Sequence, residues 1–232
     1  MKEYLFKVIA RIESDFPEKF GIPRQSGLLR TLKSTIRFEK EFRNPDALRG
    51  LEGFSHLWLL WIFSENVRDT WHPTVRPPRL GGNTRLGVFA TRSSFRPNPL
   101  AMSCVKIEEI RPNGKDGPEI VVSGADLMDG TPIVDIKPYL PYADCKSDAV
   151  DGLAGLADRN TVDVDFPEAL LQIIPEDKRE SILEVLRQDP RPGYRHAGDE
   201  RRYGVKFAGF DVRFIAQADG LRVVEVVPLE KE

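Results

Sequence analysis

Arginine is concentrated in one segment of this sequence. Six arginines and no lysine lie between residues 68 and 99, where Asp69 is the single acidic residue. They are Arg68, Arg76, Arg79, Arg85, Arg92 and Arg96. The planar guanidinium group suits two-pronged binding of phosphate or carboxylate, and Pro and Gly turns rather than a helix carry the segment. Some of these arginines can cap loops or pair with surface acids, and we expect the remainder to face an anionic ligand.

A second basic cluster, with tyrosines among it, lies in residues 189–203. Its members are Arg191, Arg195, Arg201, Arg202, Tyr194 and Tyr203. Arginine beside tyrosine suits phosphate contact and base stacking in single-stranded RNA. The alternative is a polar loop in which Asp189, Asp199 and Glu200 satisfy the same arginines, and composition does not choose between the two.

Three acids, Asp126, Asp129 and Asp135, surround a turn at residues 129–132. An Asp-Gly pair is typical of an ordinary turn, which is one interpretation. A divalent-metal site would need the carboxylates to converge with further oxygen ligands, and the spacing does not require that, so we expect no metal. In a third interpretation the turn presents Asp129 and backbone groups to a polar ligand.

Several common site motifs are missing. The sequence has no GxGxxG, GxxxxGK[ST], CxxC, HExxH or GxSxG motif, so a Rossmann dinucleotide turn, a P-loop and a nucleophile elbow are not supported. Of the three scattered histidines, His56 is expected to be structural, whereas His72 lies near the arginines and is open to ligand contact. The formal charge of −2 argues that any nucleic-acid contact uses a local patch rather than bulk charge.

Hydrophobic patterning predicts a mainly β chain. Strands are expected at residues 5–12, 57–63, 87–91, 102–110 and 119–123. Residues 57–63 (LWLLWIF) are expected to be a strand buried on both faces. A short helix is expected at residues 45–49, with Asn44 as N-cap, Pro45 at its first position and Gly50 after it. Many short strands with few helices favour a barrel or a sandwich.

The composition shifts to Asp, Ala and Gly near residues 143–159, which is typical of a connector. We therefore predict an N-terminal domain of residues 1–145, a linker of residues 146–165 and a small α+β C-terminal domain of residues 166–232. In the last, helices are expected at residues 167–174 and 175–187, and a β-hairpin at residues 207–216 and 221–227.

Cellular location is read from cysteine usage and apolar runs. Two cysteines do not make a disulfide scaffold, and the first residues lack the apolar core of a signal peptide. The longest apolar run has seven residues, too few to span a membrane. We expect a cytoplasmic protein without a membrane segment.

Six motifs together resemble one known family. They are IPRQ (22–25), RGLEGFSHLW (49–58), PTVRPPRLGGN (73–83), GVFATRSSFRPNPL (87–100), DLMDGTPIVDIKPYLPYAD (126–144) and QDPRPGYR (188–195). The sequence is similar to the TrmO family, also called TsaA-like or UPF0066, of S-adenosylmethionine-dependent tRNA methyltransferases. The resemblance runs from about Tyr4 to the C-terminal hairpin.

The resemblance implies a β-barrel catalytic domain that binds S-adenosylmethionine without a Rossmann sheet, followed by a small C-terminal domain. The implied reaction is N6-methylation of the threonylcarbamoyl-modified adenosine directly 3′ of the anticodon in threonine tRNAs, by a homodimer that contacts the anticodon stem-loop. Such a fold is consistent with the missing GxGxxG motif.

By the same resemblance, cofactor contacts are expected from eleven residues. They are Gln25, Ser26, Gly27, Ser64, Glu65, Arg92, Met102, Asp129, Gly130, Thr131 and Pro132. Ser64 and Glu65 differ from the His-Gln pair of some bacterial members, although contacts through the backbone can survive that change.

Substrate phosphates or the threonyl carboxylate are expected to bind Arg76, Arg79, Arg85 and Arg96, with Arg191 and Arg195 from the tail. Methyl transfer to a weakly nucleophilic amine depends mostly on alignment. If a base assists, Asp126 or Asp129 is the nearest carboxylate candidate.

Two other function classes stay open at this point. A non-catalytic tRNA-binding barrel would bind tRNA in a salt-sensitive way without methyl transfer, and the change at Ser64 and Glu65 motivates it. A metal-dependent hydrolase would use Asp126, Asp129 and Asp135.

Overall fold

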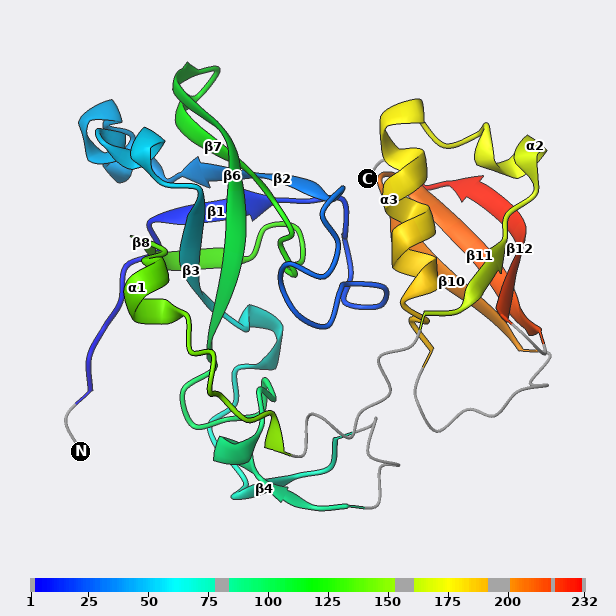
Figure 1. The fold of residues 1–232 in the computed structure, drawn as a ribbon, viewed down its shortest axis with the longest axis horizontal. Coiled ribbons are helices and arrows are strands. Elements are labelled where there is room, and N and C mark those ends of the chain that lie inside the picture. The colour runs from blue at the N-terminus through cyan, green and yellow to red at the C-terminus, as the bar shows by residue number, and fades with distance from the viewer. Residues whose placement is uncertain (1–2, 78–83, 153–160, 192–200, 218–219, 231–232) are drawn as a thin grey trace.

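The fold was analysed in a computed structural model, which describes residues 3–77, 84–152, 161–191, 201–217 and 220–230. Two parts built on β-sheets lie side by side (Figure 1). The first is a closed antiparallel barrel with strand order β1-β2-β7-β6-β3-β8. Its strands are β1 (Ala10–Glu13), β2 (Lys33–Phe38), β3 (His56–Ile62), β6 (Leu100–Gly114), β7 (Gly117–Ser123) and β8 (Pro132–Pro138).

The second part is a four-stranded sheet of order β10-β11-β12-β9 with helix α3 packed on it. Its elements are β9 (Asp163–Asp165), α2 (Glu168–Leu171), α3 (Glu176–Arg187), β10 (Arg202–Phe207), β11 (Phe210–Gln217) and β12 (Gly220–Pro228). Strand β9 falls within the stretch expected to be a linker, and it pairs in parallel with β12. We call residues 161–230 the C-terminal module.

Short elements complete the chain. A two-stranded ribbon joins β4 (Thr74–Val75) and β5 (Leu86–Gly87), and α1 (Pro141–Asp144) follows the barrel. The 3-10 turns are η1 (Lys40–Phe42), η2 (Pro45–Leu48), η3 (Leu51–Gly53), η4 (Ser64–Asn66) and η6 (Val88–Ala90). In the described ranges no helix combines the length and the apolar character that crossing a bilayer requires.

The mainly β fold with a barrel and a smaller α+β part is confirmed, but local predictions differ in places. Residues 57–63 form the expected strand, yet its side chains alternate between buried and half-buried, because Leu57, Leu59 and Trp61 point into the barrel core while the other face is covered only partly. The expected burial on both faces is therefore wrong.

Three other expectations need correction. Residues 87–91 form the end of β5 and the 3-10 turn η6 rather than a strand, and the first strand begins only at Ala10. The helix expected after Asn44 is a 3-10 turn, although the Asn44 side chain caps it as predicted by accepting from the Asp46 N–H at 3.0 Å. Strands β2, β8 and β10 were not predicted.

A segment of the barrel half belongs to the core of the C-terminal module. Residues 14–32 connect β1 to β2, and Phe16, Leu29 and Leu32 are buried among side chains of α3 and β10–β12. The Phe16 ring lies 5.3 Å from that of Phe207 in an edge-on arrangement. Packing against the C-terminal module therefore fixes the path of residues 14–32.

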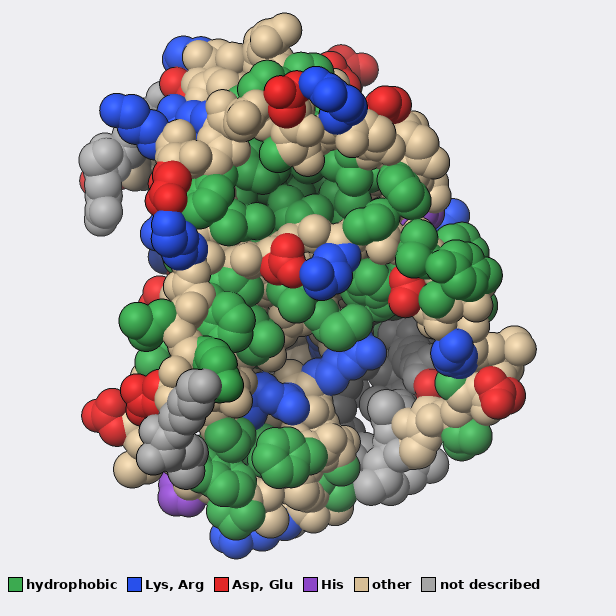
Figure 2. Space-filling view, turned by 90° about the vertical axis from the view of Figure 1, so that its left-hand side faces the viewer, with side chains coloured by type: hydrophobic (Ala, Val, Ile, Leu, Met, Phe, Trp, Pro, Cys, Tyr) green, Lys and Arg blue, Asp and Glu red, His purple; other side chains and the backbone are tan. Residues whose placement is uncertain are grey.

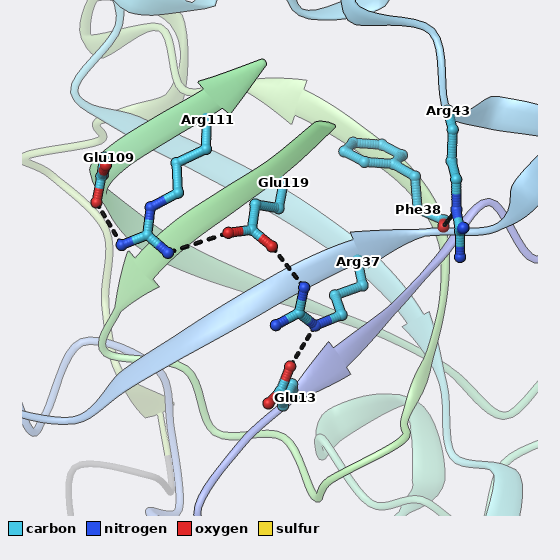
Figure 3. A network of polar contacts seen from close by, with 7 residues as sticks. All are labelled: Glu13, Arg37, Phe38, Arg43, Glu109, Arg111 and Glu119. Atoms are coloured by element: carbon cyan, nitrogen blue, oxygen red, sulfur yellow. Dashed lines mark hydrogen bonds and ion pairs between the residues drawn. The ribbon is translucent and has the colours of Figure 1, made fainter. Parts of the chain in front are cut away.

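An ion-pair network on the outside of the barrel joins the four neighbouring strands β1, β2, β7 and β6 (Figure 3). Glu119 on β7 is only 5% exposed, and it faces Arg37 on β2 and Arg111 on β6 in register. It accepts from Arg37 at 2.5 Å and from Arg111 at 3.0 Å. The arginines also pair with the exposed acids Glu13 and Glu109. Glu119 is the buried centre of the network because both guanidinium groups converge on it.

Replacing Glu119 by alanine is expected to lower the free energy of unfolding by about 2 kcal/mol, because two cations lose a desolvated partner. Urea unfolding followed by circular dichroism measures the change. The matched control is Glu109→Ala, which removes an exposed carboxylate from the same Arg111 and should cost far less. Equal losses in the two variants would contradict the central role of Glu119.

Candidate functional site

The site is a cavity of about 550 Å³ at one end of the barrel. Its walls come from residues 19–25 of the β1–β2 connection, the end of β3 with η4, the turn at residues 91–96, the start of β6 and residues 126–131. Leu60, Trp61, Phe63, Met102 and Met128 give it largely apolar walls. A mostly apolar cavity of this size with a few polar groups is typical of small-molecule sites.

The cavity gathers six of the eleven residues expected to contact the cofactor. These are Gln25, Ser64, Glu65, Arg92, Met102 and Thr131. They come from segments far apart in the sequence, and barrel closure places the ends of β3, β6 and β8 together. The motifs therefore converge in space, although their separate roles stay a prediction.

The other five do not line the cavity but support its walls. The Ser26 hydroxyl accepts from the Cys104 N–H at 3.0 Å, and the Gly27 N–H donates to the Gly124 carbonyl at 2.8 Å. Asp129 accepts from the Ser14 N–H at 2.9 Å. Gly130 and Pro132 belong to the junction of β1 and β8. These contacts fasten the loops that carry the lining residues.

Arg92 is held inside the cavity wall by a neutral partner. Its guanidinium group donates to the side-chain oxygen of Gln25, which lines the cavity from the β1–β2 connection. The bond fixes both side chains without an acid that would neutralise the charge of Arg92. A fixed guanidinium group is suited to binding an anionic or carbonyl group of a ligand.

Asp126 is the most deeply buried acid of the cavity. Trp61 donates its indole N–H to the Ser103 hydroxyl at 2.9 Å, and Ser103 donates to Asp126 Oδ1 at 2.5 Å. Burial raises the pKa of Asp126, and hydrogen bonds from Ser103 and the charge of Arg92 oppose that shift in part. An acid with a raised pKa inside a cavity is a candidate for proton transfer.

Of the arginines expected to bind substrate, Arg96 lines the cavity, where it donates to the Thr91 and Ser93 carbonyls. Arg76 and Arg85 are exposed outside the cavity wall. Arg191 makes a two-pronged ion pair with Asp189, as the polar-loop interpretation proposed. Arg79 and Arg195 lie outside the described residues.

The three acids of the turn have separate surroundings. Asp126 lines the cavity, Asp129 is exposed and bonds to Ser14, and Asp135 pairs with Lys137 at 2.8 Å. Within the part of the chain that the structure describes, no group of three or more His, Cys, Asp or Glu side chains is arranged to hold a metal. His72 is exposed and away from the cavity wall.

The sequence prediction missed Lys19 and Arg24, two cations that line the cavity from the β1–β2 connection. Arg24 lies within the IPRQ motif, so the motif itself was a signal. Lys19 lies in no motif, and its place in the wall follows from the fold of residues 14–32. The apolar run of residues 57–63 predicts a buried strand, but it does not indicate that Leu60 to Phe63 line a cavity.

Comparison with known proteins places both halves in one family. Residues 11–145 match the model of the tRNA-methyltransferase O N-terminal domain, and residues 159–229 match that of the TrmO C-terminal domain. The chain is 44% identical to the tRNA (adenine(37)-N6)-methyltransferase of Escherichia coli, over 98% of this chain and 100% of that protein. It is 42% identical to a putative S-adenosylmethionine-dependent methyltransferase, RcsF, of Pseudomonas aeruginosa, over 94% and 95% of the two chains.

Solved structures agree with the sequence comparison. A crystal structure of TrmO from Pseudomonas aeruginosa has a TM-score of 0.77 and 36% identity, covering 98% of each chain. Because the matches take in the barrel, the cavity and the C-terminal module, this chain belongs to the TrmO family.

Proposed function

We propose that this protein methylates N6 of adenosine 37 in tRNA with S-adenosylmethionine as the methyl donor, and that the substrate base carries a threonylcarbamoyl group, as in threonine tRNAs. The observation that carries the proposal is the cavity in which Asp126, Arg92 and Gln25 meet, in a chain similar over its full length to an enzyme named for that reaction.

The cavity fits the proposed cofactor. Its apolar walls suit the aliphatic chain and the purine of S-adenosylmethionine, and the carboxylates of Asp126 and Glu65 suit its positive sulfonium and ammonium groups. The cofactor would contact the six lining residues named above, which are Gln25, Ser64, Glu65, Arg92, Met102 and Thr131. When bound, S-adenosylmethionine supplies a methyl group on a sulfonium that leaves as a neutral thioether.

Asp126 is proposed to accept the proton that N6 must lose. The N6 nitrogen of the modified base is bonded to both a purine ring and a carbonyl, so its lone pair is delocalised and its attack is helped by proton removal. Ser103 fixes Oδ1 as an acceptor, and burial gives the carboxylate a raised pKa. Alignment of the amine with the methyl carbon supplies the rest of the acceleration.

Several finer points belong to the same proposal. Residues 1–145 are the proposed catalytic domain and residues 166–232 the C-terminal domain, joined by residues 146–165, of which β9 belongs to the C-terminal sheet. The enzyme acts in the cytoplasm as a homodimer on the anticodon stem-loop. Exposed apolar side chains support self-association: Figure 2 shows such side chains gathered in a hollowed area on the barrel side, and Leu5, Phe6 and Tyr142 are each more than half exposed.

The proposed function is tested by transfer of labelled methyl from S-adenosylmethionine to purified threonine tRNA with and without the threonylcarbamoyl group. We expect label on the modified tRNA only. No label on either tRNA, with salt-sensitive tRNA binding intact, would favour the non-catalytic barrel instead.

Arg92→Ala should weaken S-adenosylmethionine binding by about tenfold or more, because a charged hydrogen-bonding group and its bond to Gln25 are lost together. Calorimetric titration of the cofactor and steady-state turnover measure the effect. Arg30→Ala is the matched control, since Arg30 is an exposed arginine that does not line the cavity. Wild-type affinity and turnover in Arg92→Ala would remove Arg92 from the site.

Asp126→Asn should lower the rate of methyl transfer by about a hundredfold and abolish the rise of that rate with pH in the acidic range, where the wild-type carboxyl loses its proton. Because burial raises the folded-state pKa, the ionised carboxylate destabilises the fold as pH rises above the unfolded pKa. The Asp126→Asn variant should therefore have a free energy of unfolding at neutral pH no lower than that of the wild-type protein. A rate with the wild-type pH profile would exclude Asp126 as the base.

A further inference from the structure

The cavity carries more positive than negative side chains. Four cations, Lys19, Arg24, Arg92 and Arg96, line it together with two carboxylates, Asp126 and Glu65. Two positive charges are therefore in excess in a largely apolar cavity, where opposite charges attract more strongly than in bulk water.

The four cations are held in place without being neutralised. Within the described part of the chain none of them forms an ion pair. Arg92 donates to the Gln25 amide oxygen, Arg96 to the Thr91 carbonyl at 3.0 Å, and Arg24 to the Asp189 carbonyl at 2.8 Å. Lys19 lies over the Phe95 ring, 5.9 Å from its centre. Fixed but uncompensated cations form a site that is preorganised for an anion.

The proposed cofactor does not account for this excess. S-adenosylmethionine carries a sulfonium and an ammonium against one carboxylate, so its net charge is positive. Arg92 lies close enough to Asp126 to lower its pKa, which places that cation beside the acid. Lys19, Arg24 and Arg96 have no acid partner among the described residues. If Arg96 takes the one carboxylate of the cofactor, Lys19 and Arg24 remain for a second anionic group.

Lys19 and Arg24 lie toward the C-terminal module. Besides the main cavity they line a smaller pocket of about 130 Å³, whose far wall is formed by Val185, Gln188 and Pro190 at the end of α3. We propose that Lys19 and Arg24 form a carboxylate-binding subsite, which takes the threonyl carboxylate of the modified adenosine. The assignment rests on the proposed function, because that substrate is the source of the carboxylate.

The C-terminal module positions Arg24 through its backbone. Asp189 follows α3 with a φ of 45°, in the left-handed region that ends many helices. Its N–H donates to the Leu186 carbonyl at 3.0 Å, and its own carbonyl accepts from Arg24. The ion pair with Arg191 secures the Asp189 side chain at the same turn. Arg24 thus keeps its charge while the end of α3 fixes its direction.

The test compares two forms of one substrate with the full-length enzyme. An anticodon stem-loop carries the threonylcarbamoyl group at adenosine 37 either as the free carboxylate or as its methyl ester. Wild-type enzyme should show at least about a tenfold lower KM for the acid than for the ester. Arg24→Ala and Lys19→Ala should raise the KM for the acid toward that of the ester, with kcat and the dissociation constant of S-adenosylmethionine unchanged.

Arg30→Ala is the control, since Arg30 is an exposed cation in the same connection that lines neither pocket. It should leave the preference for the acid intact. Equal KM values of wild-type enzyme for acid and ester would overturn the subsite. Weaker S-adenosylmethionine binding in Arg24→Ala would also overturn it, by assigning the cation to the cofactor.

Failure of the proposed function is separable from failure of the subsite. Direct titration of the free modified nucleoside, as acid and as methyl ester, measures carboxylate binding without turnover. If wild-type enzyme methylates neither stem-loop, the proposed function fails. A preference for the acid nucleoside that Arg24→Ala removes would still support the subsite, and the same affinity for both nucleosides would reject it.

Discussion

The site depends on the burial of Phe16, Leu29 and Leu32 in the core of the C-terminal module. All three residues belong to the connection between β1 and β2. The part of that connection between Phe16 and Leu29 includes the cavity wall from Lys19 to Gln25. Fully buried aromatic and leucine side chains each contribute about 2 to 3 kcal/mol. Because that burial fixes the loop from outside the barrel, the C-terminal module is a structural part of the cavity.

The same loop is fastened to the barrel at its other side. Strand β6 pairs with β7 only from Lys106 onward, so the Cys104 N–H, before that pairing begins, bonds to the Ser26 hydroxyl instead. Gly124, directly after β7, has a φ of +79°, and a Cβ there would lie 3.1 Å from the Gly27 Cα. Glycine at position 124 therefore permits the close approach of the β1–β2 connection. Ser26 and Gly27 thus anchor the loop that follows the IPRQ motif, a role that the family resemblance does not distinguish from cofactor contact.

Sequence reasoning succeeded where a pattern was local. The strand at residues 57–63, the Asn44 cap and the helix of residues 176–187 follow from periodicity and capping. Strand β2 has a weak pattern because only Ile36 and Phe38 are apolar. The role of Arg37 is visible only beside Glu119 on the neighbouring strand. Six of the eleven residues that the family resemblance assigns to the cofactor line one cavity. Lys19 carried no signal, since its role arises from tertiary packing of an otherwise ordinary loop.

Two sets of arginines in this protein differ in the groups that accept their hydrogen bonds. On the barrel surface, Arg37 and Arg111 share the buried carboxylate of Glu119, so their charges are neutralised within the fold. In the cavity, Arg24 and Arg96 donate to backbone carbonyls and Arg92 donates to an amide. A neutral acceptor fixes direction while leaving the charge available to a ligand. A neutral acceptor alone does not mark a ligand site, because Arg43 and Arg179 donate to the Phe38 and Ile174 carbonyls outside the cavity. What distinguishes the arginines proposed to bind ligand is a neutral acceptor together with a place in the cavity wall.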